Sequence, residues 1–276
     1  MLFFALLACA DPPSTASGAP TPPVEEAVAS PPAARRFASA AEALKVVLAS
    51  DPRVLGVGEV HATTDGPSGT TTIARFTTEL LPVLAPRTSD LVIETWRLDG
   101  ACGAPAAAVV DQVEVDTKRP AETKSEIVIL GEAALAAGVK PHDLIFACAE
   151  YQQLLGPDGA VLYDALLRLL TQKLGDYAAQ ALARPDARLV LYGGAMHNDL
   201  FPHEGAEAYS YGLRARETGG ASYVELDLYD PALVVGKALF VEAAWEPLLA
   251  EAGPDHVLLI ERGPQSYVLL LPTATP

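Results

Sequence analysis

Basic side chains are scarce in this chain of 276 residues, which has 19 lysine and arginine residues against 35 aspartate and glutamate residues. The formal net charge at pH 7 is therefore −16. Because binding of a phosphate backbone needs a basic patch, nucleic acid is not expected as a partner. The same charge balance argues against attraction of the folded part to an anionic membrane surface.

Motifs of several well-known enzyme classes are also missing. The segment Gly56-Val-Gly58 lacks the third glycine of the dinucleotide-binding fingerprint, and the sequence has no Gly-Lys-Ser/Thr phosphate loop. There is no His-Glu-x-x-His, and the segment 66–69 lacks the serine spacing of a nucleophile elbow. A nucleotide-dependent enzyme or a serine hydrolase is therefore poorly supported.

Cysteine is rare, and the three cysteines form no Cys-x-x-Cys pattern, so neither a zinc ribbon nor a thioredoxin-type site is indicated. The first cysteine ends the segment Leu6-Leu-Ala-Cys9, which resembles a bacterial lipobox. The alternative is a frayed apolar N-terminus, because this run is far shorter than the roughly 20 residues of a membrane span. Residues 10–36 are rich in proline and alanine, which is typical of a linker.

These features predict a lipoprotein signal-like segment at 1–9, a disordered linker at 10–36 and a single α/β domain at 37–276. Lipid on Cys9 would tether the protein in the cell envelope, at the outer membrane or the periplasmic face, and would be its only membrane contact. In that oxidising compartment Cys102 and Cys148 are a candidate disulfide. Two buried thiols are the alternative.

Half of the residues are hydrophobic, and short apolar runs alternate with longer amphipathic segments. This alternation predicts an α/β fold with a mostly parallel sheet flanked by helices. The last two apolar runs predict an antiparallel C-terminal edge hairpin. The expected strands are 54–57, 91–96, 144–147, 189–192, 222–228, 257–260 and 266–271, and the expected helices are 39–49, 71–84, 121–137, 161–183 and a segment around 242–252.

One short motif occurs twice, as Gly58-Glu-Val-His61 and as Gly194-Ala-Met-His197. Each copy follows an apolar run, so each glycine is expected to mark the end of a buried strand. Ligand crevices form at the carboxyl ends of parallel strands, where two imidazoles can converge. His61 and His197 are therefore candidates for metal ligands or for acid and base catalysts. A strand-end histidine bonded to the backbone is the alternative for each.

Two glutamates share this context. Glu59 and Glu94 each follow an apolar run, where a carboxylate is costly without a partner. With the two histidines they predict either a metal site with an open position, in which His61, Glu94 and His197 are ligands, or a water-activating site. A salt bridge from Glu94 to Arg97 or Arg75 is the alternative. His142 is expected in a surface turn and His203 in a loop.

Together, Gly58-Glu-Val-His61, the Leu-Val-Ile-Glu94 strand and Gly194-Ala-Met-His197 resemble the superfamily that joins erythromycin esterases, ChaN-type haem-binding lipoproteins and TraB/Tiki proteases. The lipobox makes the chain most similar to the ChaN branch. The resemblance implies an α/β fold whose site lies at the strand ends and contains Glu59, His61, Glu94 and His197. An arginine of the esterase type is expected soon after the first motif, with Arg75 as the candidate.

The resemblance leaves two functions open. The first is a hydrolase that binds zinc, manganese or iron, or that activates water without a metal, and that acts on a small-molecule or peptide substrate. The second is a haem- or iron-binding uptake lipoprotein without catalysis, with His61 and His197 contacting the cofactor. The loop after His61 lacks the further histidine that is common in ChaN-like chains, and this weakens the haem interpretation.

Overall fold

A computed structural model of the chain describes residues 32–64, 66, 69–100, 102, 112–113, 115–237, 240 and 243–272. The candidate lipidation site Cys9 and most of the expected linker lie outside the described residues. In the described part of the chain, no helix combines the length and the apolar character that a membrane span requires.

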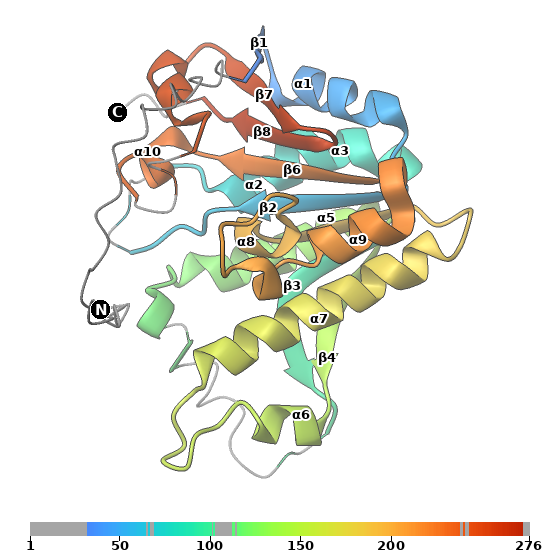
Figure 1. Cartoon of the computed structure of the whole chain (residues 1–276), viewed down its shortest axis with the longest axis vertical. Helices are drawn as coiled ribbons and strands as arrows, with labels where there is room; N and C mark the ends of the chain where they lie inside the picture. Colours follow the sequence, from blue (N-terminus) through green and yellow to red (C-terminus); the bar gives the residue numbers. More distant parts are fainter. Residues whose placement is uncertain are drawn as a thin grey trace, which may run out of the picture.

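The core of the molecule is an eight-stranded sheet with the order β1-β7-β8-β6-β2-β5-β3-β4 (Figure 1). Strands β8, β6, β2, β5, β3 and β4 pair in parallel, whereas β7 is antiparallel to both of its neighbours. This arrangement confirms the predicted fold class. The strands are β1 (Ala34–Phe37), β2 (Val54–Glu59), β3 (Asp90–Leu98), β4 (Lys140–Phe146), β5 (Leu189–Gly194), β6 (Tyr223–Tyr229), β7 (Val257–Gly263) and β8 (Ser266–Leu270).

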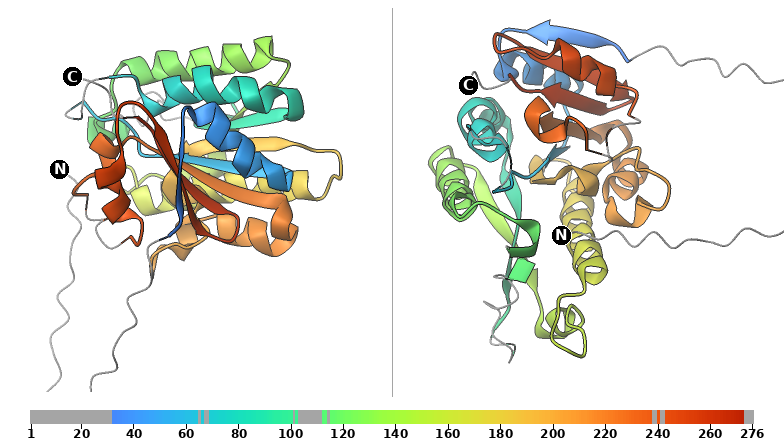
Figure 2. Two further views of the ribbon diagram at one scale, coloured as in Figure 1. Left: turned by 90° about the horizontal axis from the view of Figure 1, so that it is seen from above. Right: turned by 90° about the vertical axis from the view of Figure 1, so that its left-hand side faces the viewer.

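Helices cover both faces of the sheet, which gives three layers (Figure 2). One face packs against α1, η2, α3 and α5, and the other packs against α7 and α9. The helical elements are α1 (Ala40–Val47), η1 (Leu48–Ser50), α2 (Thr72–Arg75), η2 (Phe76–Leu80), α3 (Leu81–Leu84), η3 (Ala85–Arg87), α5 (Glu122–Ala136), α6 (Cys148–Gln152), α7 (Tyr163–Leu182), α8 (Ala195–Asn198), η4 (Glu207–Tyr209), α9 (Gly212–Gly219), η5 (Gly220–Ser222), α10 (Pro231–Val234) and η6 (Glu246–Glu251).

Capping residues account for where two of the predicted helices begin or end. Ser39 caps α1 by accepting a hydrogen bond from the Glu42 amide at 3.2 Å. Gly138 follows α5 with φ +80°, a left-handed conformation that glycine adopts without strain. The helix expected around 242–252 is instead the short 3₁₀ segment η6, and Pro247 occupies its first turn.

Two expectations need correction, the end of the linker and the place of His142. Strand β1 begins at Ala34, inside the segment 10–36 that the composition assigned to the linker. Its backbone pairs with β7, and pairing of this kind is not visible in composition. The antiparallel hairpin β7–β8 lies at this side of the sheet, as predicted, and β1 adds the outermost strand. His142 also lies in β4 rather than in a surface turn, and its Nε2 is 2.7 Å from Asp90 Oδ1.

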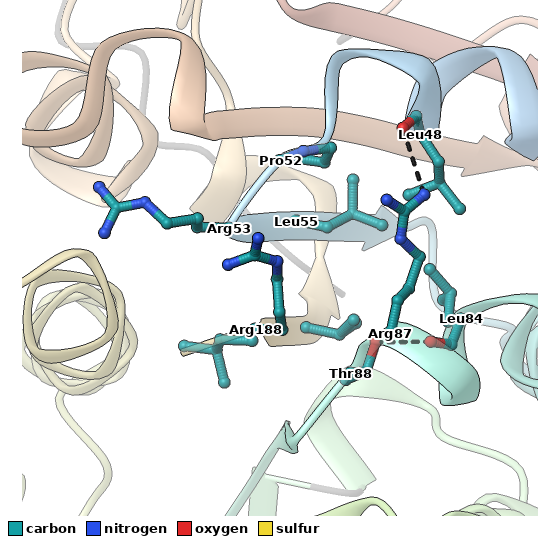
Figure 3. Close-up of a pocket in the computed structure, with 10 residues that line it drawn as sticks. Leu48, Pro52, Arg53, Leu55, Leu84, Arg87, Thr88 and Arg188 are labelled. Atoms are coloured by element: carbon teal, nitrogen blue, oxygen red, sulfur yellow. Dashed lines mark hydrogen bonds between the residues drawn. The ribbon is translucent and has the colours of Figure 1, made fainter. Parts of the chain in front are cut away.

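The amino-terminal ends of the central strands are closed. Figure 3 shows Arg53, Arg87 and Arg188 at this end, around a cavity of only about 10 Å³. Arg87 donates to the Leu48 carbonyl at 3.2 Å, and Arg188 forms an ion pair with Asp51 at 3.3 Å. These arginines satisfy loop and helix-end groups, and the cavity beside them is too small for a ligand larger than water.

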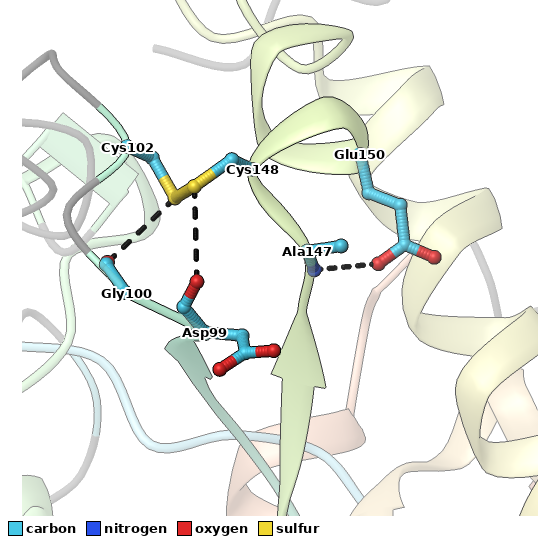
Figure 4. Close-up of a disulfide and its surroundings, with 6 residues drawn as sticks. All are labelled: Asp99, Gly100, Cys102, Ala147, Cys148 and Glu150. Atoms are coloured by element: carbon cyan, nitrogen blue, oxygen red, sulfur yellow. Dashed lines mark hydrogen bonds between the residues drawn. A yellow bond between two sulfur atoms is a disulfide. The ribbon is translucent and has the colours of Figure 1, made fainter.

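Cys102 and Cys148 are joined by a disulfide in the structure (Figure 4). The bond ties the segment after β3 to the first residue of α6, which follows β4. The carboxyl ends of two neighbouring parallel strands are thus linked covalently, beside the edge of the sheet where the site lies.

Candidate functional site

A cavity of about 380 Å³ opens at the carboxyl ends of β2, β3 and β5. All four polar residues that the sequence singled out line this cavity. Glu59 and Glu94 lie in β2 and β3, His61 follows β2, and His197 lies in α8 after β5. Its apolar walls come from α7 and from the segment after β6. The walls include Leu166, Leu167, Leu170, Tyr229, Phe240 and Trp245.

Glu59 orients His61. Its Oε1 lies 2.7 Å from His61 Nδ1, and its Oε2 accepts a hydrogen bond from the Tyr192 hydroxyl at 2.6 Å. Burial, followed by the Glu59 charge, raises the pKa of Tyr192, so this phenol stays protonated and remains a donor. Since Glu59 engages Nδ1, Nε2 is the ring nitrogen of His61 that remains for other groups.

Glu94 forms a buried pair with His197. Glu94 Oε2 accepts the Gly194 amide at 2.6 Å, and Oε1 lies 3.4 Å from His197 Nε2. Burial alone would raise the pKa of Glu94, but His197, His61 and the Gly194 amide together lower it to about 2. Burial alone would lower the pKa of His197, but the Glu94 charge raises it. The pair is therefore an ionised carboxylate beside an imidazolium near pH 6.

The opposite nitrogen of His197 is held from α7 and η4. Its Nδ1 lies 3.0 Å from the Tyr209 carbonyl and 2.7 Å from Thr171 Oγ1. A carbonyl oxygen only accepts, so Nδ1 carries a proton and Nε2 faces Glu94. Both imidazoles thus have Nδ1 fixed by an oxygen partner.

The α-carbon of Gly194 marks where these groups meet. A Cβ at this position would lie 3.3 Å from His61 Nε2, 3.6 Å from His197 Cδ2 and 3.7 Å from Glu94 Oε2. The missing side chain leaves a small space that both histidines and Glu94 surround. The two copies of the Gly-x-x-His motif, separated by more than a hundred residues, therefore contribute to one site.

Only one of the two motif glycines ends its strand, as the sequence predicts for both. Gly58 lies within β2 and Gly194 ends β5, and neither has a positive φ. Gly58, and Gly193 just before the second motif, make room for side chains of neighbouring elements. A Cβ on Gly193 would lie 2.2 Å from Glu94 Oε2, and one on Gly58 would lie 2.4 Å from Asp227 Oδ1.

The segment that follows His197 is anchored to β6 and β7 through charged groups. Arg262 pairs with Asp199 and, at 2.8 Å, with Glu225. Asn198 Nδ2 donates to Asp227 Oδ1 at 3.0 Å. Burial raises the pKa of Glu225 well above its ordinary value and that of Asp227 to about 6, although Arg262 opposes both shifts. This network fixes α8, and with it His197, against the sheet.

Other residues named from the sequence lie elsewhere or play a different part. Arg75 donates to the Pro272 carbonyl at 3.1 Å and does not line the cavity. Arg97 lies 3.9 Å from Asp143, so neither arginine is the partner of Glu94. Two arginines line the cavity instead, Arg262 of the network just described and Arg119, which precedes α5. No motif surrounds Arg119, and the orienting roles of Thr171 and Tyr192 likewise depend on contacts between distant segments.

The described residues contain no group of three or more histidine, cysteine, aspartate or glutamate side chains arranged to hold a metal ion. Two features nevertheless suit a metal. Each imidazole has its Nδ1 engaged by an oxygen partner, as histidine ligands commonly do, and the space beside Gly194 adjoins both rings and Glu94. If a metal binds, His61, Glu94 and His197 are the residues that would hold it, after His197 loses its Nε2 proton.

Comparisons with known proteins add little. No family model and no curated protein matches the chain. Among solved structures, the chain is similar to the type III effector HopBA1, with a TM-score of 0.41 and 15% sequence identity, over 73% of this chain and 88% of that chain. At this distance the similarity carries no inference about function.

Proposed function

We propose that this protein is a hydrolase in which His61 activates water and the Glu94–His197 pair supplies a proton. The observation that carries the proposal is the pair of imidazoles around Gly194, each with its Nδ1 fixed by an oxygen partner. Two histidines at one site, one beside Glu59 and the other paired with Glu94, are suited to acid–base catalysis near neutral pH. The adjoining cavity of about 380 Å³ is of a size that holds a small organic substrate.

The proposed reaction divides the work between the two rings. His61, whose Nδ1 faces Glu59, takes a proton from water through Nε2 as the water oxygen bonds to the substrate carbonyl. His197 donates its Nε2 proton to the leaving group as the bond from the carbonyl carbon breaks. Glu94 stabilises the imidazolium before this transfer, and exchange of a proton with solvent restores both rings. A metal held by His61, Glu94 and His197 would supply Lewis acidity to the same reaction.

The test is hydrolysis of a panel of nitrophenyl esters, anilides and phosphodiesters by the purified wild type and by His61→Ala and His197→Ala. Loss of a general acid or base is expected to lower kcat/KM by about 10²- to 10⁴-fold. His256→Ala is the matched control, because His256 bonds the Glu251 carbonyl at 3.1 Å and does not line the cavity. Unchanged hydrolysis in both site variants would refute the proposal.

Elemental analysis of the same proteins decides between the two forms of the site. About one equivalent of zinc, manganese or iron in the wild type, lost in the double variant His61→Ala/His197→Ala, supports the metal-dependent form. The alternative function, haem uptake without catalysis, predicts a Soret band shift on haem titration that disappears in the same double variant.

The location in the cell envelope is part of the proposal. The Cys102–Cys148 disulfide supports an oxidising compartment, since such bonds rarely persist in the cytosol of mesophiles. Metabolic labelling of the full chain with a fatty acid tests the anchor directly. Label is expected in the wild type and absent in Cys9→Ser, and equal labelling of the two would refute lipidation at Cys9.

A further inference from the structure

A second cavity adjoins the first. It has a volume of about 300 Å³ and lies between the end of β3 and the start of α5. Glu94, Val113 and Arg119 line both cavities, so the two spaces share a border beside the Glu94–His197 pair. A molecule that reaches the two histidines can therefore extend in two directions.

The first cavity is suited to an apolar group. Tyr229, Phe240 and Trp245 form one wall, with ring centroids 5.1 to 5.6 Å apart. The three carboxylates among its described lining residues already have partners. Glu59 bonds His61 and Tyr192, Glu94 pairs with His197, and Asp199 pairs with Arg262. Apolar burial is therefore the main interaction that this cavity offers a ligand.

The second cavity has a different character. Arg119 stands at its border, and Thr95, Thr123 and Lys124 also line it. The positive charge of Arg119 acts on Tyr192, the partner of Glu59, where it opposes the larger effects of burial and Glu59 that raise the pKa of this phenol. A guanidinium with nearby hydroxyl groups is a suitable environment for a carboxylate or another anionic oxygen group. This cation is notable in a chain with net charge −16.

We propose that the substrate is an ester with an apolar acyl group in the first cavity and an anionic leaving group beside Arg119. This inference rests on the proposed hydrolase function. Because both imidazoles line the first cavity, the carbonyl carbon lies against them there. The leaving group then extends past Glu94 into the second cavity. Its oxygen lies beside Glu94, where it receives the proton of the neighbouring His197 Nε2.

A matched pair of chromogenic esters tests the proposal. The two compounds are 3-hexanoyloxy-4-nitrobenzoate and 2-nitrophenyl hexanoate, which differ only in the carboxylate of the leaving group. We expect kcat/KM to favour the anionic ester by about 10- to 100-fold, as for a hydrogen bond to a charged group. Arg119→Ala is expected to abolish that ratio, and Arg119→Lys to keep part of it. Shortening the acyl group is expected to lower kcat/KM by about fourfold for each methylene removed.

Arg97→Ala is the control variant, because Arg97 is an exposed arginine on β3 that lines neither cavity. It is expected to keep the wild-type ratio. Equal kcat/KM for the two esters, or a ratio that Arg119→Ala leaves intact, would overturn the inference while the hydrolase proposal stands.

Binding measurements distinguish the two proposals when the protein hydrolyses neither ester. The ethers 3-hexyloxy-4-nitrobenzoate and 2-hexyloxynitrobenzene keep the shape of the esters and are not hydrolysed. Calorimetric titration is expected to show tighter binding of the anionic ether to the wild type, with the difference lost in Arg119→Ala. This result in a protein that hydrolyses neither ester would support the binding site and refute the hydrolase. Equal affinity for both ethers would refute the binding site.

Discussion

Replacement of Gly194 by alanine should separate activity from stability. The alanine methyl group would enter the space between His61 Nε2, His197 Cδ2 and Glu94 Oε2, at 3.3, 3.6 and 3.7 Å. The last two are ordinary van der Waals distances, and the first requires the His61 ring to move by a few tenths of an ångström. The backbone of Gly194, with φ −67° and ψ 136°, suits alanine without strain.

The expected magnitudes follow from these distances. Contacts of this kind cost at most about 1 kcal/mol, and alanine recovers roughly 0.5 kcal/mol by restricting the unfolded chain. The melting temperature should therefore stay within about 4 °C of the wild type. The methyl group would nevertheless occupy the place where the water and the carbonyl must meet. A displacement of about 1 Å at a reacting centre costs roughly 100-fold, so kcat/KM should fall by at least that factor.

Calorimetry and ester hydrolysis on the same preparations provide the assay. Gly131→Ala is the control, because Gly131 lies in α5 and a Cβ there has no neighbour within 4 Å, so this variant should be active and slightly more stable. Gly193→Ala should lose both stability and activity, since its Cβ would lie 2.8 Å from the Glu94 Cβ. A fully active Gly194→Ala protein would show that chemistry does not occur beside Gly194, and an unfolded one would show that the packing argument is wrong.

Two further predictions concern the stability of the fold. In the Glu94–His197 pair the carboxyl pKa is lowered, to about 2 instead of 4.5, and the imidazole pKa is raised. The pair therefore contributes fully to the free energy of unfolding between pH 4.5 and 6.5. Glu94→Gln should therefore lose roughly 3 kcal/mol of unfolding free energy near pH 5.5 and less at pH 3 or 9. Urea titrations at each pH measure this loss, and a loss that does not depend on pH would contradict the ion pair. The Cys102–Cys148 bond spans a sequence separation of 46, so Cys102→Ser/Cys148→Ser should lose about 4 kcal/mol. A reducing agent should destabilise the wild type but not this variant, and equal unfolding free energies of the two oxidised proteins would contradict a stabilising disulfide.

The strands of the parallel sheet could be predicted from the sequence because they are buried on both faces. Val54–Glu59 and Leu189–Gly194 are almost wholly buried, and each is a nearly continuous apolar run. Tyr223–Tyr229 is buried as well, but it was predicted from its alternating pattern, since it carries Glu225 and Asp227. Elements of four or five residues were missed, such as α6 and α10. Their formation depends on caps and on packing with distant segments rather than on a repeating pattern.

The same distinction applies to the site. Glu59, His61, Glu94 and His197 could be named because each lies in or directly after a recognisable strand, and the order of the strands brings these segments together. Arg119, Thr171 and Tyr192 could not be named. Thr171, for example, lies in the middle of α7, where a threonine usually bonds its own helix, and only the fold shows that it also reaches His197.

The two outer strands of the sheet have a consequence for how copies of this protein meet. An exposed strand edge is a template for adding another chain and for aggregation. Strand β4 begins with Lys140-Pro141, where proline cannot donate to a neighbouring backbone, and β1 presents the exposed side chains of Arg35 and Arg36. A second copy that approaches β4 would find no backbone N–H at Pro141. A copy that approaches β1 would have to desolvate the charged side chains of Arg35 and Arg36. The open sheet that holds the site is thereby protected from growing into a fibre.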